Sequence, residues 1–151
     1  MSSVSRYMQA GQRYCDGLFE LIEPLAFDAK WEEAGQALLA FCCGLERHLE
    51  REERVVLPLI EEAYGPAYEP TRTMRMEHAG MRALLTAVEG AGVRRDAQEL
   101  SAVMQTLRSM MQQHSSRAED VIYPLADALS GGRAGDLLQA LESRPPVAAR
   151  A

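Results

Sequence analysis

The chain has 151 residues, enough for one domain with a sizeable hydrophobic core. Hydrophobic residues make up 47% and aromatic residues only 6%, and the abundance of Leu, Ala, Met, Glu and Arg favours helices packed on helices, hence an all-α fold. The net charge of −6 excludes nucleic acid and anionic membranes as main partners, because no basic run supplies the attraction.

The sequence also favours one cellular compartment. No run of about 18 apolar residues occurs, and the first 14 residues hold no apolar stretch, so we expect neither membrane spanning nor secretion. The three cysteines lack a Cys-x-x-Cys pair, which argues against a disulfide framework. We therefore expect a cytoplasmic protein.

The first half of the chain predicts two helices. Apolar residues at spacings of three and four predict a helix over residues 4–25, with its buried stripe at Val4, Met8, Gly11, Cys15, Leu18 and Ile22. Asp28 is the predicted N-cap of a second helix. The buried stripe of this helix runs from Trp31 to Leu59 and includes His48 and Glu52, and the helix ends at the sequence Tyr64-Gly65-Pro66.

The second half predicts two more helices. The third opens at Pro70 and is broken by glycines at 90 and 92, with a buried stripe at Met74, His78, Met81, Leu85 and Val88. Asp96, followed three residues later by Glu99, predicts the start of a fourth helix. Its stripe reads Val103, Leu107, Met110, His114, Ala118, Val121 and Leu125, and Ser130-Gly131-Gly132 ends it.

Four helices joined by short loops predict an up-down-up-down four-helix bundle over residues 1–132. In that arrangement the second and fourth helices run in the same direction. We expect a short helix over residues 136–141 and a frayed tail from Arg144 within the remaining segment, residues 133–151.

One phrase occurs twice in the chain, as HLEREERVVLPL from His48 and as HSSRAEDVIYPL from His114, offset by 66 positions. Because the two copies lie on helices that run in the same direction, their histidines are expected at the same depth of the bundle. Each copy also carries a proline, Pro58 or Pro124, which removes a backbone hydrogen bond and should bend its helix at a cost near ~3 kcal/mol if uncompensated.

The three histidines of the chain all fall on predicted inward stripes. A single core histidine is more often a satisfied polar residue than a ligand. Three histidines with Glu52 place several ionisable groups in one apolar interior, and metal coordination would compensate both the charge and the lone pairs. His48 and Glu52, four residues apart, project from one helical face toward one ion.

The other carboxylates near the histidines give weaker signals. Glu119 follows His114 by five residues, which rotates it about 140° away, so it reaches the site sideways or faces solvent. Glu77 is expected to orient a ligand or to form a surface pair. Arg51 and Glu53 are interpreted as parts of a solvated face, together with Glu50 and Arg54. The methionines are interpreted as core filling.

The chain resembles the hemerythrin-like family, the HHE cation-binding four-helix bundles, over residues 6–129. The resemblance lies in three motifs of the second, third and fourth helices: His48-x-x-x-Glu52-Glu53 with Leu57-Pro58, Met76-Glu77-His78, and His114 with Tyr123-Pro124. The resemblance implies non-haem iron, di-iron or mononuclear, with another divalent metal as an option. It implies that His48 binds one iron, that His78 and His114 bind the other, and that Glu52 bridges them.

The chain departs from the family pattern at three positions. Gln12 stands where the first helix would supply a histidine, and Met74 stands where some members have a further one. The second bridging carboxylate is expected at Ala118 in some members and at Glu119 in others. Gln12 and Glu119 are therefore kept as candidate ligands.

Two functions remain open at this point. The first is a protein that binds or senses oxygen, another small diatomic ligand such as nitric oxide, or peroxide at iron. No additional acid–base pair singles out an enzyme, although peroxide turnover stays open. The second is a metal-depleted bundle that serves as a structural or protein-interaction module. A homo-oligomer is compatible with either function.

Overall fold

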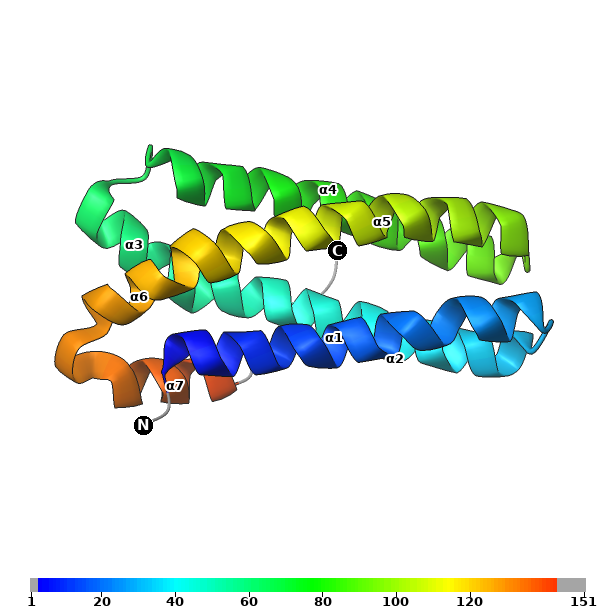
Figure 1. Ribbon diagram of the computed structural model, residues 1–151, viewed down its shortest axis with the longest axis horizontal. Coiled ribbons are helices and arrows are strands. Elements are labelled where there is room, and N and C mark those ends of the chain that lie inside the picture. Colours follow the sequence, from blue (N-terminus) through cyan, green and yellow to red (C-terminus); the bar gives the residue numbers. More distant parts are fainter. Residues whose placement is uncertain (1–2, 144–151) are drawn as a thin grey trace.

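The computed structural model describes residues 3–143 and shows four long helical rods that run antiparallel to their chain neighbours (Figure 1). The rods are α1 (Val4–Phe27), the continuous run α2–η1–α3, α4 (Glu69–Val93), and the continuous run α5–η2–α6. The predicted up-down-up-down four-helix bundle is confirmed. No strand occurs among the described residues.

The helix starts follow local sequence, with one correction. The Ser3 side chain caps α1 by accepting from the Arg6 N–H, and Asp96 caps α5 (Ala97–Arg117) in the same way through Glu99. The predicted N-cap role of Asp28 is wrong, because this residue forms the C-terminal cap of α1. The helix α2 (Trp31–Arg51) instead begins after Lys30, which makes no side-chain cap.

Each copy of the repeated phrase contains a π-helical turn just before its proline. These turns are η1 (Glu52–Val56), which leads into α3 (Leu57–Tyr64), and η2 (Ala118–Ile122), which leads into α6 (Tyr123–Ser130). The N–H groups of Leu57 and Tyr123 donate to carbonyls five residues back. The wider turn lets the helix continue past a proline, which has no backbone N–H to donate.

The π turns shift the phase of the buried stripe, because each wide turn holds more residues than an α turn. In the second copy Val121 is 42% exposed and Ile122 is fully buried, so the predicted stripe is wrong by one residue there. The stripes of α1 and α5 are also shifted at places: Gln12 and Phe19 are buried rather than Gly11 and Leu18, and Met104 and Met111 rather than Val103 and Met110.

The C-terminal part described by the structure closes one end of the bundle. The predicted short helix is α7 (Ala134–Glu142), which follows the 3-10 turn η3 (Gly131–Arg133) and lies beside the start of α1 (Figure 1). Leu141 is fully buried, and its carbonyl accepts from Arg51 Nε at 2.9 Å. Arg51 is therefore not part of a solvated face as predicted. The tail predicted from Arg144 lies outside the described residues.

The bundle interior consists of two apolar clusters separated by a polar layer. One cluster, with Phe41 and Leu107, fills the end with the α1–α2 and α4–α5 loops, and the other, with Ile60 and Met74, fills the end covered by α7. Every rod passes from one cluster to the other. At that crossing each rod buries a polar side chain, and the layer consists of Gln12, His48, Glu52, His78 and His114.

Candidate metal centre

The polar layer converges on one carboxylate oxygen. Glu52 Oε1 lies 3.0 Å from His114 Nε2, 3.5 Å from His48 Nε2 and 3.6 Å from His78 Nε2. All four side chains are at most 2% exposed. The predicted meeting of the three histidines and Glu52 in one region of the core is confirmed.

Three of these four residues form a group that could hold one metal ion. One ligand atom from each of Glu52, His78 and His114 lies within 4.8 Å of the others, which is the spacing that a single ion can span. His48 is not a member of that group, although it lies next to the same carboxylate oxygen. The carboxylate thus forms a three-ligand group with two of the histidines and also contacts the third.

Two of the histidines are backed by carboxylates that are in turn held by arginines. Glu53 Oε2 lies 3.3 Å from His78 Nδ1 and also accepts from Arg82. The predicted exposure of Glu53 to solvent is therefore wrong, since only a quarter of its side chain is exposed. A carboxylate behind a histidine fixes the ring orientation and raises the basicity of the nitrogen that faces a metal.

The same arrangement backs His114. Glu77 Oε1 lies 3.5 Å from His114 Nδ1 and accepts from Arg117 Nε at 3.3 Å. The orienting role predicted for Glu77 fits this geometry. The sequence offered no signal for the arginines, because each lies on a different helix from the carboxylate that it pairs with.

His48 has different neighbours. An ideal Cβ on Gly11 would lie 3.1 Å from His48 Nδ1, so the ring packs directly against the backbone of α1. On its other side, the Tyr123 hydroxyl lies 3.2 Å from His48 Nε2. Tyr123 is only 1% exposed. Sequence analysis missed this phenol as a member of the site, and its inward position follows from the π turn that precedes it.

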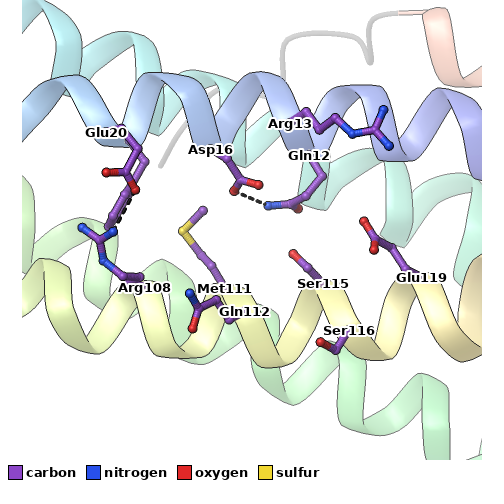
Figure 2. A pocket seen from close by; sticks show the side chains of 11 residues that line it. Gln12, Arg13, Asp16, Glu20, Arg108, Met111, Gln112, Ser115, Ser116 and Glu119 are labelled. Atoms are coloured by element: carbon purple, nitrogen blue, oxygen red, sulfur yellow. Dashed lines mark hydrogen bonds and ion pairs between the residues drawn. The ribbon is translucent and has the colours of Figure 1, made fainter.

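Gln12 and Glu119 lie beside this cluster, at a surface hollow between α1 and the α5–η2–α6 rod (Figure 2). Gln12 is buried, and its Nε2 donates to Asp16 Oδ1 at 2.9 Å. Glu119 is exposed. The hollow has a volume of about 590 Å³. The roles of Gln12 and Glu119 as ligands stay predictions.

Several polar atoms of the layer have no hydrogen-bond partner among the described residues. They are His48 Nδ1, Glu52 Oε2, both ring nitrogens of His78, and His114 Nδ1. Each unsatisfied buried polar group costs on the order of 1–3 kcal/mol. By contrast, buried Thr71 and Ser130 donate to backbone carbonyls. Two of these atoms, Glu52 Oε2 and His78 Nε2, belong to the side-chain ends that meet at Glu52, where a cation would satisfy them. The Nδ1 atoms of His78 and His114 instead face the carboxylates of Glu53 and Glu77.

The electrostatics of the cluster favour an ionised carboxylate. Burial raises the pKa of the Glu52 carboxyl, but the surrounding histidines outweigh burial and hold that pKa well below its ordinary value. Burial lowers the pKa of His114, yet Glu52 and Glu77 bring it up to about 9. For His48 burial dominates and lowers the pKa to about 4. The His48 imidazole is therefore neutral at neutral pH and can offer a lone pair to a metal. Burial also raises the pKa of the Tyr123 phenol.

The family model described as the Hemerythrin HHE cation binding domain matches residues 5–126. The match spans most of the chain and all four rods of the bundle. No curated protein and no solved structure matches the chain.

Proposed function

Since the chain belongs to the hemerythrin HHE cation-binding family, we propose that it binds non-haem iron at Glu52, His78 and His114. Two imidazole nitrogens and one carboxylate oxygen on one side of an ion are the donor set that non-haem ferrous iron sites use, with positions left open. The main support for the proposal is the buried group of these three ligands, in which Glu52 Oε2 and His78 Nε2 form no hydrogen bond.

The proposed ligand of the iron is oxygen, another small diatomic molecule such as nitric oxide, or peroxide. Iron supplies the site that binds or reduces such molecules when it is present. The chain's own contribution is an apolar enclosure on both sides of the polar layer, which admits small molecules while limiting water. The hollow lined by Gln12 offers an approach from the surface to that layer.

Binding or sensing is favoured over catalysis, since no further acid–base pair in the sequence singles out an enzyme. We place this function in the cytoplasm, and no helix among residues 3–143 is long and apolar enough to cross a membrane.

The rival function is a metal-depleted bundle that acts as a structural or interaction module. Ala118 and Gln12, which stand at positions where the family supplies ligands, favour the rival. The carboxylates behind His78 and His114 oppose it, since a site without metal has no need of backed imidazoles.

Metal analysis of protein purified without affinity tags or chelators separates the two functions. We expect about one iron or more per chain in the native protein, and electron paramagnetic resonance of the ferrous protein with nitric oxide should show an iron nitrosyl signal. The variant Glu52→Ala should lose both. The matched control Glu33→Gln, an exposed position on the same helix, should keep both. Native protein that takes up no divalent metal would contradict the proposal.

A further inference from the structure

The Tyr123 hydroxyl is buried beside His48, the histidine that contacts Glu52 without belonging to the group of Glu52, His78 and His114. We propose that the Tyr123 phenol oxygen joins His48 Nε2 and the Glu52 carboxylate, which the family resemblance assigns to one iron, as a further ligand, and that this phenol makes the subsite select ferric iron. This inference rests on the proposed function and adds a ligand of a different chemical type to it.

Tyr123 differs in chemical character from the residue at the same position of the other repeat copy. Tyr123 corresponds to Leu57 in the first copy, and each residue directly follows a π turn and is buried. In the first copy the position is filled by an apolar side chain. In the second copy the same position brings a phenol oxygen into the polar layer. Burying a hydroxyl among apolar groups is costly unless another group compensates it.

The Tyr123 hydroxyl has His48 as its neighbour in the polar layer. His48 Nε2 lies between two oxygen atoms, with the Tyr123 hydroxyl at 3.2 Å and Glu52 Oε1 at 3.5 Å. His48 Nε2 thus contacts one oxygen from its own α2–η1–α3 rod and one from the α5–η2–α6 rod, and an ion bound to His48 has both oxygens as neighbouring donors.

The first helix leaves a ligand position open near His48. Gly11 lets α1 approach His48 closely, and the next residue, Gln12, directs its amide nitrogen to Asp16 rather than to the histidines. A histidine on α1 is thus not available, and the phenol of Tyr123 supplies a third donor from the neighbouring α5–η2–α6 rod.

The chemistry of the donors indicates the oxidation state. When ferric iron binds, an iron–oxygen bond forms to the phenol oxygen as the O–H bond breaks, and the proton leaves to solvent. A phenolate is a hard anionic oxygen that pairs with a small, highly charged cation, and tyrosine is a known axial ligand of iron in catalase. The His78–His114 pair offers imidazole nitrogens in place of a phenolate and suits ferrous iron better.

Absorption and resonance Raman spectra of the native protein loaded with ferric iron test the inference. We expect a visible charge-transfer band from phenolate to iron, and enhanced phenolate vibrations when the laser excites that band. Tyr123→Phe keeps the ring and should lose both signals. The control Tyr7→Phe, a partly buried tyrosine under Arg51 that lies outside the polar layer, should keep both.

Iron content distinguishes this inference from the proposed function. The native protein and Tyr7→Phe should bind ferrous iron equally, because Tyr7 lies outside the polar layer that holds His78 and His114. Iron-loaded native protein without the band, or a band that persists in Tyr123→Phe, would overturn the phenolate subsite and leave the proposed function standing. Native protein that binds no iron in either oxidation state would overturn both. The native spectrum needs no variant, so a folding defect in Tyr123→Phe cannot obscure the result.

Discussion

Glu52 and Ala118 occupy the same position in the two copies of the repeat: each is the first residue of a π turn, and each is buried. Glu52 directs a carboxylate oxygen to three histidines, whereas Ala118 contributes only a methyl group to the apolar cluster near α7. The two copies therefore form similar backbones with unequal chemistry, and the site has one buried carboxylate in place of two.

Placing the family's ligand types at positions 12 and 118 should raise the number of ferrous ions bound per chain. Gln12→His with Ala118→Glu adds a nitrogen donor on α1 and a carboxylate four residues after His114. We expect the iron content under anaerobic conditions to rise toward two per chain, as measured by metal analysis. Without metal, the added polarity should destabilise the bundle by on the order of a few kcal/mol. Unchanged stoichiometry together with no larger iron-dependent stabilisation would show that other groups already complete the site.

Iron should stabilise the native fold through Glu52. A ligand at 100 times its dissociation constant stabilises the folded state by about 2.7 kcal/mol, which corresponds to a rise in Tm of about 5–10 °C for a domain of this size. We expect this rise for the native protein in a thermal melt with ferrous iron, and little or none for Glu52→Ala. Glu33→Gln serves as the control with native behaviour. An equal rise in Glu52→Ala would place the metal elsewhere.

Removing the carboxylate behind His78 should weaken metal binding without removing a ligand. Glu53→Gln takes the charge from His78 Nδ1, and we expect the affinity for ferrous iron to fall about 10- to 100-fold in a competition titration. Glu61→Gln is the matched control, because it also breaks a carboxylate–arginine pair, with Arg75, but contacts no histidine. Similar losses in the two variants would mean that Glu53 acts through general stability alone.

A methyl group at Gly11 should disturb His48. In Gly11→Ala the new Cβ would lie 3.1 Å from His48 Nδ1, so the ring must move by a few tenths of an ångström or the helix must shift. Overpacking of this kind costs typically about 1–3 kcal/mol, and we expect weaker binding of ferric iron and a weaker phenolate band.

The control for this substitution is Gly17→Ala in the same helix, where a Cβ meets nothing within 4 Å. It should raise stability by up to about 1 kcal/mol through helix propensity, with metal binding unchanged. Identical metal titrations for Gly11→Ala and native protein would show that His48 has room to spare.

The sequence by itself determined the four-helix bundle and the meeting of His48, Glu52, His78 and His114. Both follow from the helical period, because side chains three or four residues apart share one face, and apolar neighbours on that face direct it inward. The repeat also predicted the level of the histidines along the bundle, because two copies on helices that run in the same direction place equivalent residues at the same level.

Only the tertiary structure decided which groups stand around the histidines. The carboxylate–arginine pairs at Glu53 and Glu77, and the hydroxyl of Tyr123, depend on distances between helices that no periodicity within one helix encodes. The π turns changed the outcome locally, because the wide turn alters which residues point inward, as the exposure of Val121 shows. Periodicity fixes which face of a helix is buried, whereas packing fixes what that face meets.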